Sequence, residues 1–165
     1  MNLRMMLDEY QGISDTEFEQ LKDAIAAITI LISSADGTIN EHETDWAIKV
    51  TKIRSYNLPR RLATFYKQVG ETFQEDLDQL KAEFKNNPEE TVENLKFRLA
   101  TLNDVFAKLK DRQIAYELYL SFRSFARHVA RSTGGFLGWG AIGPKEDELI
   151  GLTMIHPVPP PIRDN

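Results

Sequence analysis

The segment from Ala35 to Glu43 carries the residue types and the spacing that best fit ion binding. Asp36 and Glu43 supply carboxylates, Asn40 supplies an amide oxygen, and Gly37 permits a sharp turn between them. Their order matches the second half of a calcium-binding EF-hand loop, which uses oxygen ligands of this kind. The segment therefore predicts a site for a hard divalent cation, with calcium or magnesium favoured.

The same residues have a structural interpretation that competes with metal binding. Asn40 is a good helix N-cap, and a glutamate three residues later, here Glu43, is typical of a capping box. The first half of an EF-hand loop is also missing, since Ile32 stands where the first ligand should be. If His42 joined Asp36 as a ligand, zinc would be preferred to calcium. The residues alone leave the two uses open.

A second segment, residues 142–146, repeats the pattern of residues 39–43. Each has an isoleucine, a cap residue, two helix-start residues and a glutamate, and each follows a long apolar run. The sequence therefore predicts two pseudo-repeated helix–loop–helix halves. Their loops would place Glu43 and Glu146 around one acidic pocket, with Asp147 nearby. Two carboxylates held close together repel each other, and a cation between them removes that repulsion.

The elements that must position these residues are helices. Apolar residues recur at intervals of three and four, and no stretch alternates with period two. Asn87 and Pro88 mark one helix start, and Gly70 is expected to separate two shorter helices. The sequence predicts an all-α, single-domain bundle of about seven helices, over residues 15–34, 41–56, 60–69, 73–86, 88–109, 112–131 and 144–155.

The length of 165 residues suits one domain with short extensions. We expect an N-terminal arm over residues 1–13, the helical domain over residues 14–156, and a proline-rich tail over residues 157–165. The tail contains the run PVPPP, which favours polyproline II conformation and predicts a disordered segment.

Composition excludes several classes of protein. The chain has no cysteine, which excludes a disulfide scaffold, a cysteine-based zinc finger and a thiol nucleophile. A net charge of −5 argues against a nucleic-acid partner. No apolar run approaches the roughly 20 residues of a membrane span and no secretory signal is recognised, so the expected location is the cytoplasm. No catalytic motif with the required spacing is present, so we expect no enzyme activity.

Charge and apolar residues are distributed in a way that suggests an alternative function. Residues 49–67 carry six bases and no acid, while residues 71–93 carry eight acids and two bases. Phe136, Leu137 and Trp139 lie among glycines, where they either pack between the two predicted halves or offer apolar contact to a partner or a membrane surface. The alternative is a metal-free helical scaffold or adaptor that binds a protein partner or a membrane surface. Its oligomeric state is left open by the sequence.

The chain contains two motifs, first ADGTINEHE at residues 35–43 and then the glycine-rich GGFLGWGAIGPKE at residues 134–146. In these motifs the chain resembles the TerB-like tellurite-resistance proteins, over about residues 14–155. The glycine-rich motif is the more specific of the two, because calcium loops and co-chaperone domains share the first.

The resemblance implies an all-helical bundle with pseudo-twofold halves and a surface acidic site for a divalent cation. It also implies a non-catalytic role in resistance to tellurite and other stresses. The resemblance implies that the metal ligands of this chain are Asp36, Glu43 and Glu146. The second motif has no aspartate that corresponds to Asp36, so we expect one shared metal site and not two.

Overall fold

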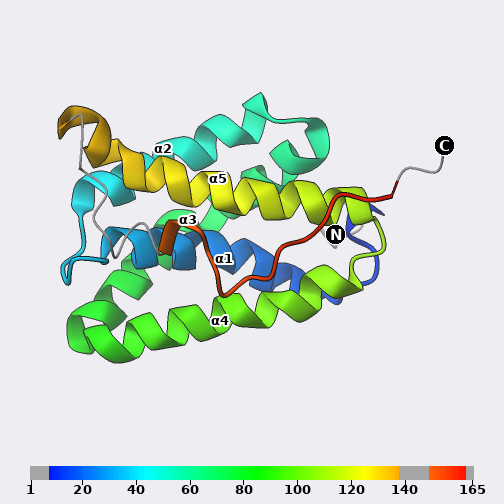
Figure 1. Ribbon diagram of the computed structural model, residues 1–165. Helices are drawn as coiled ribbons and strands as arrows, with labels where there is room; N and C mark the ends of the chain where they lie inside the picture. The colour runs from blue at the N-terminus through cyan, green and yellow to red at the C-terminus, as the bar shows by residue number, and fades with distance from the viewer. Residues whose placement is uncertain (1–7, 138–148, 163–165) are drawn as a thin grey trace.

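The computed structural model describes residues 8–137 and 149–162, which form one bundle of five α-helices without a β-strand. Figure 1 shows α2 and α5 along one side of the bundle and α4 along the opposite side, with α1 between them. The predicted all-α class is confirmed. The elements are the 3₁₀-helix η2 (Asp8–Tyr10) and the α-helices α1 (Asp15–Ser33), α2 (Glu41–Asn57), α3 (Arg60–Asn86), α4 (Pro88–Lys108) and α5 (Arg112–Leu137).

The central element is α1, which packs against all four of the other helices. It begins with a complete capping box, in which the Glu17 N–H donates to Ser14 Oγ at 3.1 Å and the Ser14 N–H donates to Glu17 Oε1 at 3.0 Å. Every residue from Ala24 to Ser33 is buried. A helix that is apolar on all sides belongs in the interior of a protein. The hydroxyl of Thr29 is accommodated there because it donates to the carbonyl oxygen of Ile25 at 2.8 Å.

The prediction of seven helices is not confirmed. Residues 60–69 and 73–86 lie in one continuous helix, α3, which passes through Gly70 without a break. Only Leu149 and Ile150 of the predicted helix over 144–155 are helical among the described residues. The second predicted loop lies largely outside the described residues. The pair of pseudo-repeated halves therefore stays a prediction.

Both segments that flank the bundle contribute side chains to the core. Tyr10 and Ile13 from the predicted N-terminal arm are buried, and so is Val158 from the proline-rich tail. The side-chain amide of Asn103 on α4 binds the backbone just before the tail. Its Nδ2 donates to the Met154 carbonyl at 3.0 Å, and its Oδ1 accepts from the His156 N–H at 2.7 Å. The prediction of a disordered tail is wrong at Val158, because its side chain packs into the bundle.

None of the helices that the structure describes combines the length and apolar character needed to cross a membrane.

Gly12 is a position where a side chain cannot be accepted. Its φ is +104°, and an added Cβ would clash with the backbone carbonyl oxygen of Lys108. We expect Gly12→Ala to lower the free energy of unfolding by about 1–3 kcal/mol, measured by urea denaturation. Gly70→Ala is the matched control, because a Cβ on this helical residue would meet nothing within 4 Å. It should raise the free energy of unfolding by about 0.5–1 kcal/mol, and a similar loss in both variants would contradict the assignment.

Candidate functional site

The acidic loop between α1 and α2 is a tight, internally bonded turn. The Gly37 N–H donates to the Ser34 carbonyl at 2.9 Å, and the Asn40 N–H donates to the Ser33 carbonyl at 2.8 Å. Gly37 has a φ of +101°, in the left-handed region that favours glycine. These bonds close the loop over the end of α1 and set where α2 begins.

Asp36 is exposed, and its carboxylate is turned back onto its own loop. Oδ1 of Asp36 accepts from the backbone N–H of Thr38 at 3.3 Å and lies 3.5 Å from the Thr38 hydroxyl. This is the geometry of an Asx turn, in which an aspartate stabilises a local bend. Part of the hydrogen-bonding capacity of Asp36 therefore serves the turn.

Asn40 and Glu43 meet at the first turn of α2. Oδ1 of Asn40 accepts from the backbone N–H of Glu43 at 3.1 Å, so Asn40 is the N-cap of the helix. The side chain of Glu43 is 1% exposed, whereas Asp36 lies at the surface. The capping role predicted for Asn40 is confirmed. Metal binding by the loop stays a prediction.

The side chains predicted to share a metal open onto different parts of the surface. Asp36 lines a cavity of about 670 Å³ with residues from the end of α3 and the start of α4, among them Glu89 and Glu93. His42 lines a separate cavity of about 320 Å³ between α2 and α5. Among residues 8–137 and 149–162, no three His, Asp or Glu side chains are grouped so as to hold a metal ion. Glu146 and Asp147, the remaining predicted ligands, lie outside the described residues.

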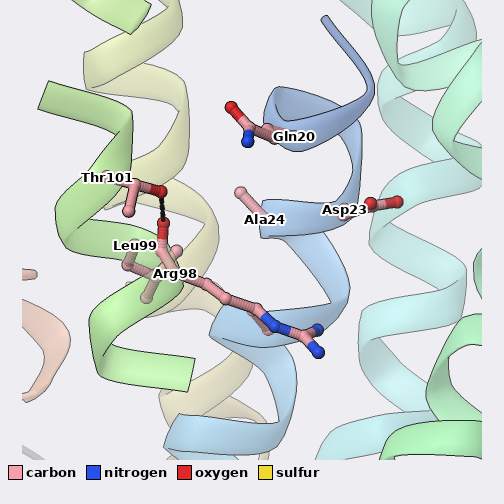
Figure 2. A pocket seen from close by; sticks show the side chains of 7 residues that line it. Gln20, Asp23, Ala24, Arg98, Leu99 and Thr101 are labelled. Carbon is pink, nitrogen blue, oxygen red and sulfur yellow. Dashed lines mark hydrogen bonds between the residues drawn. The ribbon is translucent and has the colours of Figure 1, made fainter. Parts of the chain in front are cut away.

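A further cavity, of about 290 Å³, lies between α1 and α4 (Figure 2). Its Asp23 has a pKa above the usual value, because burial and the negative charges of Asp76 and Glu19 disfavour the ionised form. In Figure 2 the Asp23 carboxylate points away from Gln20 and Thr101, which also line the cavity. The polar groups of this cavity therefore do not converge on one point, as an acid–base site would require.

The burial of Arg54, one of the six bases of residues 49–67, is not predicted by the charge pattern of the sequence. Arg54 is 7% exposed. Its Nη1 donates to the Tyr66 hydroxyl at 2.9 Å and to the Ser121 carbonyl at 2.8 Å, and its Nη2 donates to Ser124 Oγ at 2.8 Å. The guanidinium also lies over the rings of Tyr66 and Phe125, at 5.1 and 5.4 Å from their centres. The feature of the sequence that indicates this burial is the spacing of Arg54 along the helix.

That spacing puts Arg54 on the inner face of α2. Glu43, Ala47, Val50 and Arg54 follow at intervals of four, three and four residues, and all four are buried. Residues at such intervals share one side of a helix.

The opposite face of α2 combines bases with partly exposed apolar side chains. We call it the α2 face and define it as Trp46, Lys49, Lys52, Ile53 and Tyr56. Lys49 and Lys52 are exposed, and so is Asp45, which lies on the same side of the helix four residues before Lys49. The exposed fractions of Trp46, Ile53 and Tyr56 are 37%, 38% and 72%. Large apolar groups left at the surface next to cations point to a contact with another molecule.

The capping role of Asn40 gives a stability prediction. Asn40→Ala should lower the free energy of unfolding by about 1 kcal/mol, because the Glu43 N–H at the start of α2 loses its acceptor. Asp36→Ala, at an exposed position of the same loop, should change it by less than about 0.5 kcal/mol. Urea denaturation with a chelator present measures both without a contribution from bound cations. Equal losses in the two variants would contradict the assignment of the cap.

The chain matches no protein-family model, no curated protein sequence and no solved structure. Its TerB-like resemblance is therefore a prediction that rests on the two sequence motifs alone.

Proposed function

We propose that this protein is a non-enzymatic helical adaptor that docks an acidic protein partner on the α2 face. The observation that carries the proposal is the combination of exposed lysines and partly exposed aromatic and aliphatic side chains on one side of a helix. Trp46, Lys49, Ile53 and Tyr56 follow at intervals of three, four and three residues, so they form one stripe. At 1.5 Å per residue the stripe is about 15 Å long, enough to contact a helix or an extended segment.

The lysines of the α2 face would favour an acidic partner. Within the described residues neither Lys49 nor Lys52 forms an ion pair, whereas Arg61 from the same basic block is bound to Glu117 at 2.7 Å. Five of the eight acids of residues 71–93 lie on α3, which packs beside α2, and the other three lie on α4, on the far side of the bundle from α2 (Figure 1). Lys49 and Lys52 would attract an acidic molecule to the α2 face, and the acids of α4 would repel it from the opposite side of the bundle.

A protein partner suits the α2 face better than a membrane does. Trp46 and Ile53 are more than half covered by the bundle, so they do not protrude far enough to insert between lipids. The acidic helices would also be repelled by an anionic leaflet. Tryptophan and tyrosine surrounded by polar groups are, by contrast, the residues that contribute most to protein–protein binding.

A labelled amphipathic peptide with glutamate on one helical face and leucine on the other tests the docking. We expect saturable binding that weakens with salt, and Tyr56→Ser should raise the Kd by about tenfold or more. Phe97→Ser is the matched control, because Phe97 is 71% exposed on α4, on the opposite side of the bundle. Fluorescence anisotropy gives both dissociation constants.

Two other occupants of the α2 face would appear as distinct outcomes. Binding to vesicles that contain phosphatidylserine, with none to the peptide, would replace the protein partner by a membrane. Sedimentation velocity that shows association reversed by salt would point to a second copy of this chain. Equal effects of Tyr56→Ser and Phe97→Ser would overturn the docking site.

A second candidate function is the divalent-metal-binding stress protein implied by the TerB-like resemblance, linked to tellurite resistance. The observation in its favour is that Asp36 exposes a carboxylate into a cavity that Glu89 and Glu93 also line. The proposed ligands are Asp36, Asn40 and Glu43 with Glu146 and Asp147, and calcium or magnesium is preferred to zinc.

Calorimetric titration of the full chain with calcium, magnesium, manganese and zinc tests the metal site. We expect saturable binding of one ion, weakened by about tenfold or more in Asp36→Asn. Lys85→Gln is the control for a general change in surface charge. No saturable heat with any of the four ions, or unchanged binding in Asp36→Asn, would remove this candidate.

A further inference from the structure

The cavity between the first turn of α2 and the last turns of α5 gathers basic and aromatic side chains. It has a volume of about 320 Å³ and is lined by His42 and Trp46 from α2 and by His128, Arg131 and Ser132 from α5. His128, Arg131 and Ser132 lie at intervals of three and one residues, on one side of α5. None of the described lining residues is acidic. A pocket of this size accommodates a small molecule or a single side chain.

Positive charge is concentrated around His128. Burial, together with the charges of Arg54, Arg131 and Arg127, holds the pKa of His128 below its usual value. Arg131 contributes from within the cavity, while Arg54 acts from the core beneath it. Neither Glu41 nor Glu43 of α2 lines the cavity, and Glu41 accepts from Lys81 Nζ at 2.9 Å. Asp45 is exposed on the same side of α2 as Lys49 and Lys52 and does not line the cavity.

The buried Arg54 supplies a second, independent reason for an anion at this place. Its acceptors are neutral, namely the Tyr66 hydroxyl, the Ser121 carbonyl and the Ser124 hydroxyl. No described carboxylate forms an ion pair with it. A buried guanidinium whose hydrogen bonds are satisfied by neutral groups keeps its full charge, and that charge favours an anion nearby. Ser124 lies one helical turn before His128, so the cavity is close to this charge.

We propose that the α2–α5 cavity binds a phosphate group. Arg131 would supply a planar pair of N–H donors, and the imidazoles of His42 and His128 would supply single donors. Trp46 forms an aromatic wall. Ser132 is not counted as a donor, because its hydroxyl donates to the Val129 carbonyl at 2.9 Å. The pair of histidines does not make the cavity a transition-metal site, since the Arg131 guanidinium would repel a cation.

The phosphate site does not rest on the proposed adaptor function. The two share Trp46 alone, and phosphate binding requires no protein partner. The adaptor function and the phosphate site can therefore fail independently, because the first is tested with an acidic peptide and the second with phosphate.

Titration of the full chain with sodium phosphate tests the site, with sodium chloride holding the ionic strength constant. We expect saturable shifts in the NMR signals of the His42 and His128 rings, and a rise in the pKa of His128 as the dianion binds beside it. Arg131→Gln should weaken binding by about tenfold or more. Lys67→Gln is the matched control, since it removes an exposed positive charge that lines a different cavity.

The source of the phosphate group is distinguished by a second ligand. N-acetyl phosphoserine amide that binds more tightly than inorganic phosphate would identify a phosphorylated side chain as the source. Equal affinities would identify the free anion, and both results support the site. The proposal is overturned if neither ligand gives saturable shifts, or if Lys67→Gln weakens binding as much as Arg131→Gln does. His128→Asn serves as a second variant if Arg131→Gln is poorly folded.

Discussion

The burial of the second half of α1 is the constraint on which the rest of the structure depends. Over its second half, α1 has no residue that faces solvent, so the other four helices must cover it on every side. Removing this apolar surface from water is the main favourable contribution to folding. It also explains why Tyr10 and Val158, from the two segments that flank the bundle, pack into the same core. The packing of α1 also sets the position of the acidic loop, because the loop begins where α1 ends.

A polar network inside the same core sets the relation between α2, α3 and α5. Arg54 donates to Tyr66 on α3 and to Ser121 and Ser124 on α5, and the Tyr66 hydroxyl donates onward to Ser121 Oγ at 3.1 Å. Such bonds are directional, so they fix how the three helices lie side by side in a way that apolar contact alone does not. The cost is a buried positive charge with neutral partners. The α2–α5 cavity lies next to that charge, which connects the packing of the core with its proposed anion ligand.

The starts of the helices were predicted from local patterns, whereas the burial of Arg54 on the inner face of α2 was not. The caps at Asn40 and Asn87 act over three residues, and the structure has both where the sequence places them. Arg54 was grouped with its basic neighbours in sequence, although its helical spacing placed it with Ala47 and Val50 on the inner face. Gly70 was taken as a break, yet the apolar stripe of Phe73 and Leu77 beyond it continues to pack on the core and keeps α3 in one piece.

The sequence by itself determined the all-α class, the starts of α1 to α5 and the capping role of Asn40, because periodicity and capping depend on residues within a turn or two of each other. Tertiary structure decided that Asp36 and His42 open onto different cavities, since each cavity is completed by a helix distant in the chain. It also decided that Arg54 is buried and that His42, His128 and Arg131 line one space. Residues more than 80 positions apart, such as His42 and His128, are brought together only by the way in which α2 and α5 pack around α1. A pattern of neighbouring residues cannot predict that two distant residues line one cavity, because this depends on how the whole bundle packs.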